Sequence, residues 1–401
     1  MIASLIVMPA ELMANSRTAA SWLLARVLMT DRCMIRDLPG SGNGAGRESP
    51  LQVSLPRLSV VHMQRRGSAV ALLAGVAILL ELAAGAGLAY LAGWSKVEAV
   101  LGDFHGLWLI ALAGGLLVSI IGYHFAYRGI FRAGGGPTLP PRQMRAVVAA
   151  GFGGFLAHGG GALDQYALRA AGADEDEAKV RVAALGGLEH GILAVGGCAT
   201  AITVLVSGRG QPPADFTIPW AVIPIPGFLV AFWAAERYRD RFNGRGGWRH
   251  KLAIFRDSIR IIRVFFAHPW RWGSAPSGMA LFWAADAFAA WAGLAAFGFE
   301  MNAAALFVGF ATGMVFTRRT GPLAGAGVLA LVLPVTIWVS GASFAAAVVG
   351  IFAYRVLALL LPMPASLAAL PTLRTMGERP ASQAARAAEG TNEPALRRRT
   401  G

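Results

Sequence analysis

The run SAVALLAGVAILLELAAGAGLAYLA, residues 68–92, carries a single charged residue, Glu81. An apolar run of about 20 residues is long enough to cross the hydrocarbon core of a bilayer as an α-helix. Runs of the same kind follow at 105–127, 182–206, 216–235, 279–299 and 344–361. We therefore expect an all-α fold, a polytopic helical membrane bundle with about 6–8 spans.

The composition of the whole chain supports this expectation. The chain has 401 residues, of which 55% are hydrophobic and 14% are charged, whereas soluble domains carry about 25% charged residues. The net charge is +14, and the basic residues flank hydrophobic runs. This placement favours anionic membrane lipids as partners over nucleic acid. The two cysteines, Cys33 and Cys198, form no disulfide or metal pattern, and no phosphate-binding loop is found, so we expect no metal and no cofactor.

The distribution of Lys and Arg predicts the orientation, because cytoplasmic loops are enriched in these residues. Residues 236–276 hold ten basic residues, from Arg237 to Arg271. Placing this loop in the cytoplasm predicts a multi-pass protein of the cytoplasmic membrane with both termini inside. Within the loop, Lys251–Phe266 reads as an amphipathic interfacial helix, with Leu252, Phe255, Ile259, Ile262 and Phe266 on its apolar face.

Three domains are expected. Residues 1–62 read as a poorly ordered extension, residues 63–362 as the transmembrane domain, and residues 363–401 as a disordered, basic cytoplasmic tail.

Some apolar segments are too short or too rich in glycine to be simple spans: 146–163, 303–316 and 322–339. Parity of the spans requires the first to enter and leave on the cytoplasmic side, and the other two to return together to the outside. The region that begins with the first segment and the region formed by the other two each show a Gly-Phe pair, a Gly-rich turn and then a span. This pattern fits an inverted repeat of 63–235 and 277–362 with broken helices, as in many secondary transporters. Chance similarity in a chain rich in Gly and Ala is the alternative.

Specific residues near the breaks resemble a known family. In the first half these are Gly160-Gly161-Ala162-Leu163-Asp164-Gln165-Tyr166-Ala167-Leu168-Arg169, Gly172-Ala173, Ala178 and Leu188-Glu189-His190. In the second half they are Gly321-Pro322-Leu323-Ala324-Gly325-Ala326-Gly327-Val328-Leu329-Ala330 and Tyr354-Arg355 through Leu361-Pro362. Over about residues 63–365 the chain resembles the lysylphosphatidylglycerol synthase transmembrane region, also called the flippase-like domain family.

The resemblance implies handling of a membrane lipid, with three departures from the family pattern. Ala330 stands where the family has a glutamate, His190 replaces an arginine, and Asp164 is at best a substitute for another glutamate. These departures predict either a different substrate or a loss of activity. The full synthases also carry a soluble aminoacyl-transferase domain, which we expect to be absent here.

Polar residues at membrane depth and around the breaks are the candidate site. Glu81 and Asp286 lie within spans, where ionisable groups are costly; each is either a proton or substrate site or a hydrogen-bonded neutral carboxyl. Arg355 is close enough to the end of its span to snorkel to the interface. Helix breaks expose backbone N–H groups that bind anions. The alternative is an interfacial turn with solvated charges. The candidate lipid-binding residues are His158, Gly160, Gly161, Asp164, Arg169, Glu189, His190, Asp286, Arg318, Arg319, Gly325, Gly327 and Arg355.

Two function classes follow from these patterns. The first is translocation of a phosphate-bearing lipid across the cytoplasmic membrane. The second is a non-catalytic membrane subunit or scaffold of a cell-envelope lipid or glycan pathway, in which a homo-oligomer or an envelope-synthesis protein is the partner. A membrane-embedded transferase ranks last, because no convergent catalytic set is visible.

Overall fold

The computed structural model describes residues 67–376, apart from 154–155, 157–159, 209–211, 239–246 and 316–321. In this part of the chain every regular element is helical. Six of the helices are long and apolar enough to cross a membrane. Large apolar side chains also point outward along them, such as Leu79, Ile110 and Leu229, which suits a lipid environment. The chain is a multi-pass membrane protein.

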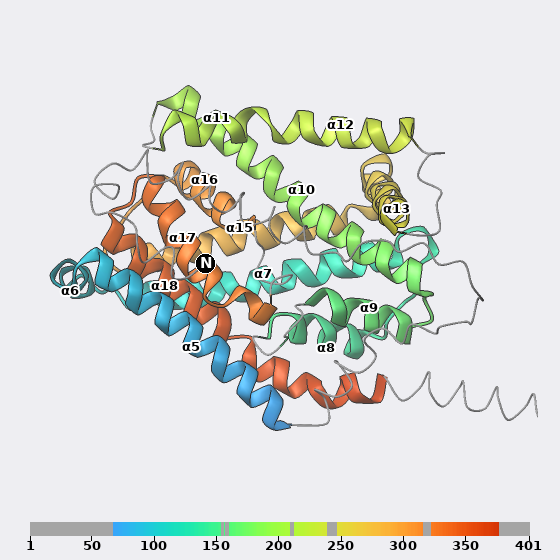
Figure 1. Cartoon of the computed structure of the whole chain (residues 1–401), viewed down its shortest axis with the longest axis horizontal. Helices are drawn as coiled ribbons and strands as arrows, with labels where there is room; N and C mark the ends of the chain where they lie inside the picture. The colour runs from blue at the N-terminus through green and yellow to red at the C-terminus, as the bar shows by residue number, and fades with distance from the viewer. Residues whose placement is uncertain are drawn as a thin grey trace, which may run out of the picture. The chain divides into compact units, whose positions relative to one another are not determined.

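The helical elements follow one another as Figure 1 labels them. They are α5 (Gly67–Ala92), α6 (Trp94–Gly102), α7 (Leu107–Arg132), η1 (Ala133–Gly135), α8 (Pro141–Gly151), α9 (Gly160–Ala170), α10 (Glu175–Ser207), α11 (Ala214–Val222), α12 (Pro224–Arg237), α13 (Gly247–Ala267), α14 (Pro269–Trp272), α15 (Ser274–Ala295), α16 (Ala303–Gly313), η3 (Pro322–Gly325), α17 (Val328–Val339) and α18 (Phe344–Leu360). The predicted spans correspond to α5, α7, α10, α11–α12, α15 and α18. The expected N-terminal extension, 1–62, lies outside the described residues.

The span α10 begins seven residues earlier than its apolar run, because charged residues form its first turns. Asp174 caps the helix by accepting a 2.7 Å hydrogen bond from the Glu177 backbone N–H. Arg181 donates to the carbonyls of Ile130, Phe131 and Ala133 at the end of α7. Arg181 therefore supplies the donors that the C-terminus of a helix lacks, and it holds the start of α10 against the end of α7.

The helices α7 and α15 pack in close antiparallel contact. A Cβ atom added to Gly122 would lie 2.7 Å from the Gly278 carbonyl oxygen, and one added to Gly129 would lie 2.6 Å from the Ala275 Cβ. Small residues at these positions let two backbones touch, which is how helices associate tightly in lipid. The start of α15 therefore lies beside the end of α7.

Two pairs of short helices form hairpins at opposite ends of this antiparallel pair. The hairpin α8–α9 connects α7 with α10, and α16–α17 connects α15 with α18. Because α7 and α15 are antiparallel, the first hairpin is rooted where α7 ends and the second where α15 ends (Figure 1). The structure thus confirms the two Gly-rich broken segments. The repeat of 63–235 and 277–362 stays a prediction.

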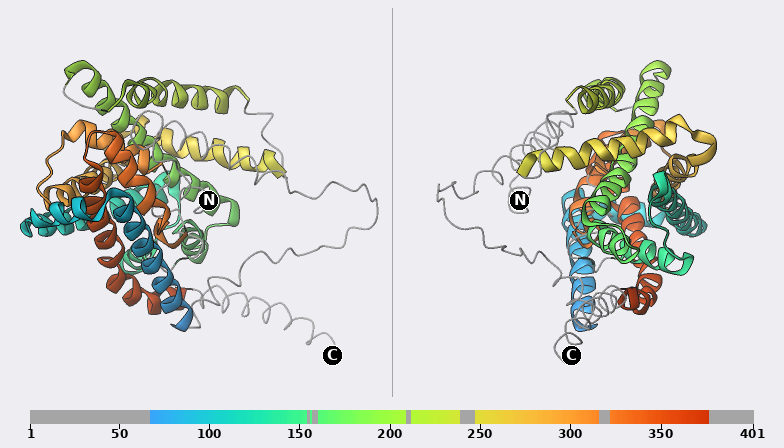
Figure 2. Two further views of the ribbon diagram at one scale, coloured as in Figure 1. Left: turned by 60° about the vertical axis from the view of Figure 1, so that its left-hand side comes forward. Right: turned by 90° about the vertical axis from the view of Figure 1, so that its right-hand side faces the viewer.

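The basic loop contains the predicted amphipathic helix as α13. It lies across the direction of α12 in the right-hand view of Figure 2 and packs on α10, where Ile262 reaches towards Gly187. Ile259 and Ile262 are buried as expected, but Phe266 is 61% exposed and Phe265 is buried instead. The buried face therefore overlaps the predicted one at Ile259 and Ile262 and is displaced from Phe266 to Phe265, because the contact with α10 selects the buried positions.

The end of the chain corrects one expectation. Residues 363–376 are helical rather than part of a disordered tail. Ala369, Leu373 and Met376 are buried, and their spacing of three or four residues forms one face of a helix. The sequence did not indicate this helix, because Pro371, Thr372, Arg374 and Thr375 interrupt the apolar positions.

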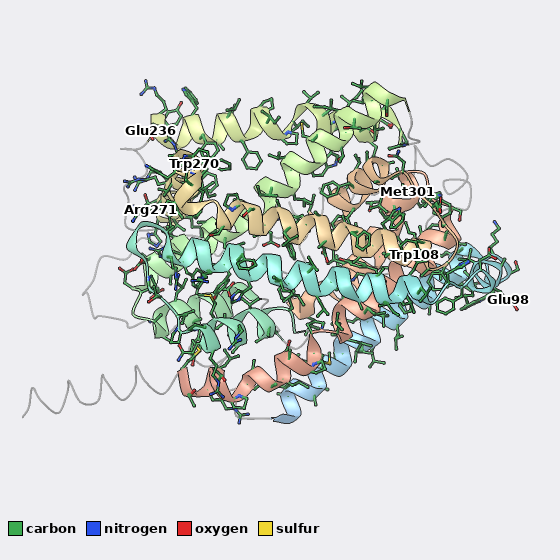
Figure 3. The ribbon with its side chains drawn as sticks, turned by 180° about the vertical axis from the view of Figure 1, so that it is seen from behind. Glu98, Trp108, Glu236, Trp270, Arg271 and Met301 are labelled. Atoms are coloured by element: carbon green, nitrogen blue, oxygen red, sulfur yellow. The ribbon has the colours of Figure 1, made fainter. Side chains whose placement is uncertain are left out.

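The two ends of the bundle carry interfacial side chains. Figure 3 shows Glu236, Trp270 and Arg271 at one end and Glu98, Trp108 and Met301 at the other. Trp108 packs edge-on against Trp291 with ring centroids 5.1 Å apart, and Trp291 donates to the Met301 carbonyl. Tryptophan is enriched where a membrane protein meets the headgroups, so the helices between these two ends match the depth of a bilayer.

Candidate functional site

The turns of the two hairpins meet inside the bundle. The backbone N–H of Leu323 donates a 2.9 Å hydrogen bond to the carbonyl of Leu156. Leu323, Gly325 and Gly327 have φ values of 51°, 72° and 77°. This left-handed backbone favours glycine, so the Gly-rich sequence is what lets the second hairpin turn here. Of the predicted residues, Gly325 and Gly327 lie at this junction.

The first hairpin places its candidates along α9. Gly160 and Asp164 are buried, and Gly161 faces Val182 of α10. Arg169 is exposed and lies in the last turn of α9, at the root of the hairpin rather than at its turn. Arg169 therefore lies at the far end of α9 from the turn. His158 lies outside the described residues.

The candidates on α10 face two directions. Glu189 is 1% exposed, and its carbonyl accepts a 2.7 Å hydrogen bond from the indole of Trp283. His190 is exposed, and its ring nitrogens lie 2.8 Å from the Gly186 carbonyl and 3.2 Å from the Val315 carbonyl. His190 therefore reaches from the outer side of α10 to the end of α16. Arg318 and Arg319, which follow Val315, lie outside the described residues.

Asp286 lies in the centre of α15 and is fully buried. One carboxylate oxygen accepts a 3.0 Å hydrogen bond from the Tyr354 hydroxyl of α18. The ring of Tyr354 packs edge-on against Phe310 of α16, which packs in turn against Trp283. Together with the bond from Trp283 to Glu189, these contacts connect α10, α15, α16 and α18 around one aromatic cluster.

Arg355 forms a buried ion pair with Glu81 of α5. Both side chains are nearly inaccessible, at 2% and 1% exposure. The expectation that Arg355 snorkels to the interface is therefore wrong, because its guanidinium is directed inward to a carboxylate on the neighbouring helix. Pairing satisfies two charges that would each be costly at this depth. Two roles were expected for Glu81, a proton or substrate site and a hydrogen-bonded neutral carboxyl. Neither of these expectations included an ion pair with an arginine.

Two residues of this interior were missed by sequence reasoning. The sequence indicated Tyr354 only through its place in the family motif. Arg181 was not among the candidate residues. Arg181 lies four residues after Glu177, with which it forms a 2.8 Å ion pair, and this i,i+4 spacing was a readable signal. The interior thus holds Glu81, Asp164, Glu189, Asp286, Arg181 and Arg355 among its buried charged groups.

Comparison of the chain with protein-family models and with curated proteins finds no match. The site is therefore interpreted from its own geometry. Its parts are two hairpin turns joined by one backbone hydrogen bond, an interhelical ion pair, and a carboxyl bonded to a tyrosine. Each of these is a polar contact between segments that are far apart in the sequence.

Proposed function

We propose that this membrane protein moves a phosphate-bearing lipid from one leaflet of the cytoplasmic membrane to the other. The observation that carries the proposal is the junction of the two hairpin turns, where Leu323 donates to Leu156. Broken helices that enter from opposite ends and meet near the middle are the plan on which many secondary transporters build a substrate site.

The junction offers suitable chemistry for a phosphate. Separating the turns frees the Leu323 N–H, and Gly325 and Gly327 let an anion approach the backbone without meeting a Cβ atom. His190 is exposed on the lipid-facing side of α10 and adjoins Val315, next to the second turn. A headgroup could follow this polar path while its acyl chains stay in lipid.

We further propose membership in the flippase-like family of the lysylphosphatidylglycerol synthase transmembrane region. The motif residues that suggest it lie at the hairpins, on α10 and on α18. Ala330, where the family has a glutamate, is buried in α17. A substrate different from that of the synthases is consistent with this departure.

The alternative function, a scaffold for a cell-envelope enzyme, has one observation in its favour. A continuous apolar core runs through α7, α10, α15 and α18, and includes Leu116, Leu193, Phe282 and Ile351. A filled bundle of this kind suits a static subunit. A transporter in an occluded state has the same core, so the two proposals differ in whether the hairpins separate.

A flipping assay in proteoliposomes separates these proposals. Fluorescent phosphatidylglycerol and phosphatidylcholine are reconstituted with the protein, and outer-leaflet fluorescence is bleached with dithionite. We expect faster loss of the phosphatidylglycerol signal than in protein-free vesicles. The variant Gly325→Leu/Gly327→Leu should lose this gain, whereas Gly75→Ala, at an open position on α5, should keep it. Wild-type rates equal to those of empty vesicles would overturn the transport proposal.

The orientation is tested separately. We propose that both termini and α13 face the cytoplasm. In a Cys33→Ala/Cys198→Ala background, Lys251→Cys on the exposed side of α13 should react with an impermeant maleimide only after the cells are opened. Labelling of intact cells, at the level of a cysteine introduced at exposed Glu98 of α6, would reverse the orientation.

A further inference from the structure

Helix α5 lies at the edge of the bundle. In its span 28% of the residues are buried, against 72% for α15. It packs against α18, α17, η3 and α6, mostly through small and aliphatic residues such as Ala77 against Leu359. A helix attached on one side and by apolar contacts can move without breaking the rest of the core.

The polar link between α5 and the bundle is the Glu81–Arg355 pair. Glu81 lies near the middle of α5, and one of its oxygens accepts from Arg355 Nη2. The other oxygen, Oε2, is buried and has no hydrogen-bond partner in the described part of the chain. The carboxylate is therefore held at one oxygen only, and not through the two parallel bonds that an arginine can offer.

This link borders the turn of the second hairpin. Leu80, the neighbour of Glu81, lies within 3.3 Å of the position a Cβ atom of Gly327 would take. Ala326 packs in the same cluster as Ala77 and Leu359, one helical turn from the ion pair. Moving α5 away would therefore uncover Arg355 and the Gly-rich turn together.

A guanidinium binds a carboxylate and a phosphate by the same geometry. Replacing one anion by another beside a buried arginine costs far less free energy than leaving the guanidinium without an anion. We propose that Glu81 is a resident anion that the phosphate of an anionic lipid displaces from Arg355, and that α5 moves aside in this exchange. The inference rests on the proposed function, since it assigns the binding residue and the moving helix of that site.

Thermal unfolding in dodecyl maltoside micelles tests the exchange. The micelles are doped with phosphatidylglycerol or with phosphatidylcholine. Glu81→Gln removes the competing carboxylate, so phosphatidylglycerol should raise its unfolding midpoint at least twice as much as it raises that of the wild type. Phosphatidylcholine should raise both equally. Arg355→Gln and the double variant Glu81→Gln/Arg355→Gln should lose the difference between the two lipids.

Glu98→Gln is the matched control, because it makes the same change of charge at an exposed position on α6. It should respond as the wild type does. If Glu81→Gln cannot be purified in plain micelles, phosphatidylglycerol present during extraction should recover it and phosphatidylcholine should not. Recovery by neither lipid, or an equal shift in Glu81→Gln and wild type, would overturn the proposal. A specific shift without flipping in vesicles would retain the site and remove the transport function.

Discussion

The two hairpins are alike in plan and differ in what holds them in place. The first is joined to the C-terminal helix by side-chain hydrogen bonds, from Tyr166 to the Leu373 carbonyl at 3.2 Å and from Ser366 to the Ala149 carbonyl at 2.6 Å. In the second, a Cβ atom on Gly309 would lie 2.8 Å from the carbonyl of Thr336. The polar hairpin is held by directed bonds and the apolar one by close backbone contact, as is typical of helices surrounded by lipid.

The largest effect is expected from a substitution that disrupts the packing of the second hairpin. In Gly309→Ala the new methyl group collides with Ser340 and Thr336 of α17, and overpacking costs about 1–3 kcal/mol. The matched variant in the first hairpin, Gly161→Ala, meets only Val182 Cγ1 at 3.7 Å and should be neutral or stabilising. Tryptophan fluorescence during thermal unfolding in detergent measures both. Equal losses in the two variants would remove the distinction between the hairpins.

The next effect is at the root of the first hairpin. Arg181→Gln replaces the charged donors that cap α7 by a neutral amide, which retains part of the about 1.5–3 kcal/mol that hydrogen bonds of charged groups contribute. We expect a lowered unfolding midpoint and faster proteolysis of the segment between α7 and α8. Lys179→Gln is the control, since Lys179 forms exposed ion pairs on the same helix. A fully stable Arg181→Gln protein would show that the hairpin root needs no cap.

A smaller effect is expected at the turn of the second hairpin. Gly327→Ala places a side chain at φ 77°, a conformation that costs about 1–2 kcal/mol for a residue with a Cβ atom. Lipid flipping should fall more than stability does, because the turn is where the phosphate is proposed to bind. Gly75→Ala serves again as the unstrained control. Loss of stability with unchanged flipping per folded molecule would contradict this role.

The smallest effect concerns the directed bonds of the first hairpin. Tyr166→Phe removes the bond to the Leu373 carbonyl, and Ser366→Ala removes a hydroxyl that is shared between the Ala149 and Pro362 carbonyls. Each change has an expected cost of about 1 kcal/mol. The double variant should show nearly additive changes in the unfolding midpoint, because the two bonds join different residues of the C-terminal helix. A large cooperative loss would show that this helix detaches as a unit.

The sequence predicted the spans and the hairpins because both depend on local composition. Apolar runs define the spans, and the parity of basic loops determines where short segments must turn back. The Glu81–Arg355 pair could not be predicted, since it joins residues 274 positions apart. Neither span contains a pattern that indicates which residue of the other span it contacts. Arg169 lies at the end of α9 away from the turn, and its role in lipid binding stays a prediction.

The short helices of the two hairpins give the junction a further property. The helices α8 and α16 have 11 residues each, so each rises about 16 Å, and their combined rise is about 33 Å. The hydrocarbon core of a bilayer is about 30 Å thick. Because the hairpins are rooted at opposite ends, a thicker membrane pulls on the hydrogen bond between Leu156 and Leu323 and a thinner one compresses it. We therefore expect the acyl-chain length of the host membrane to change the mechanical load on the hydrogen bond between Leu156 and Leu323.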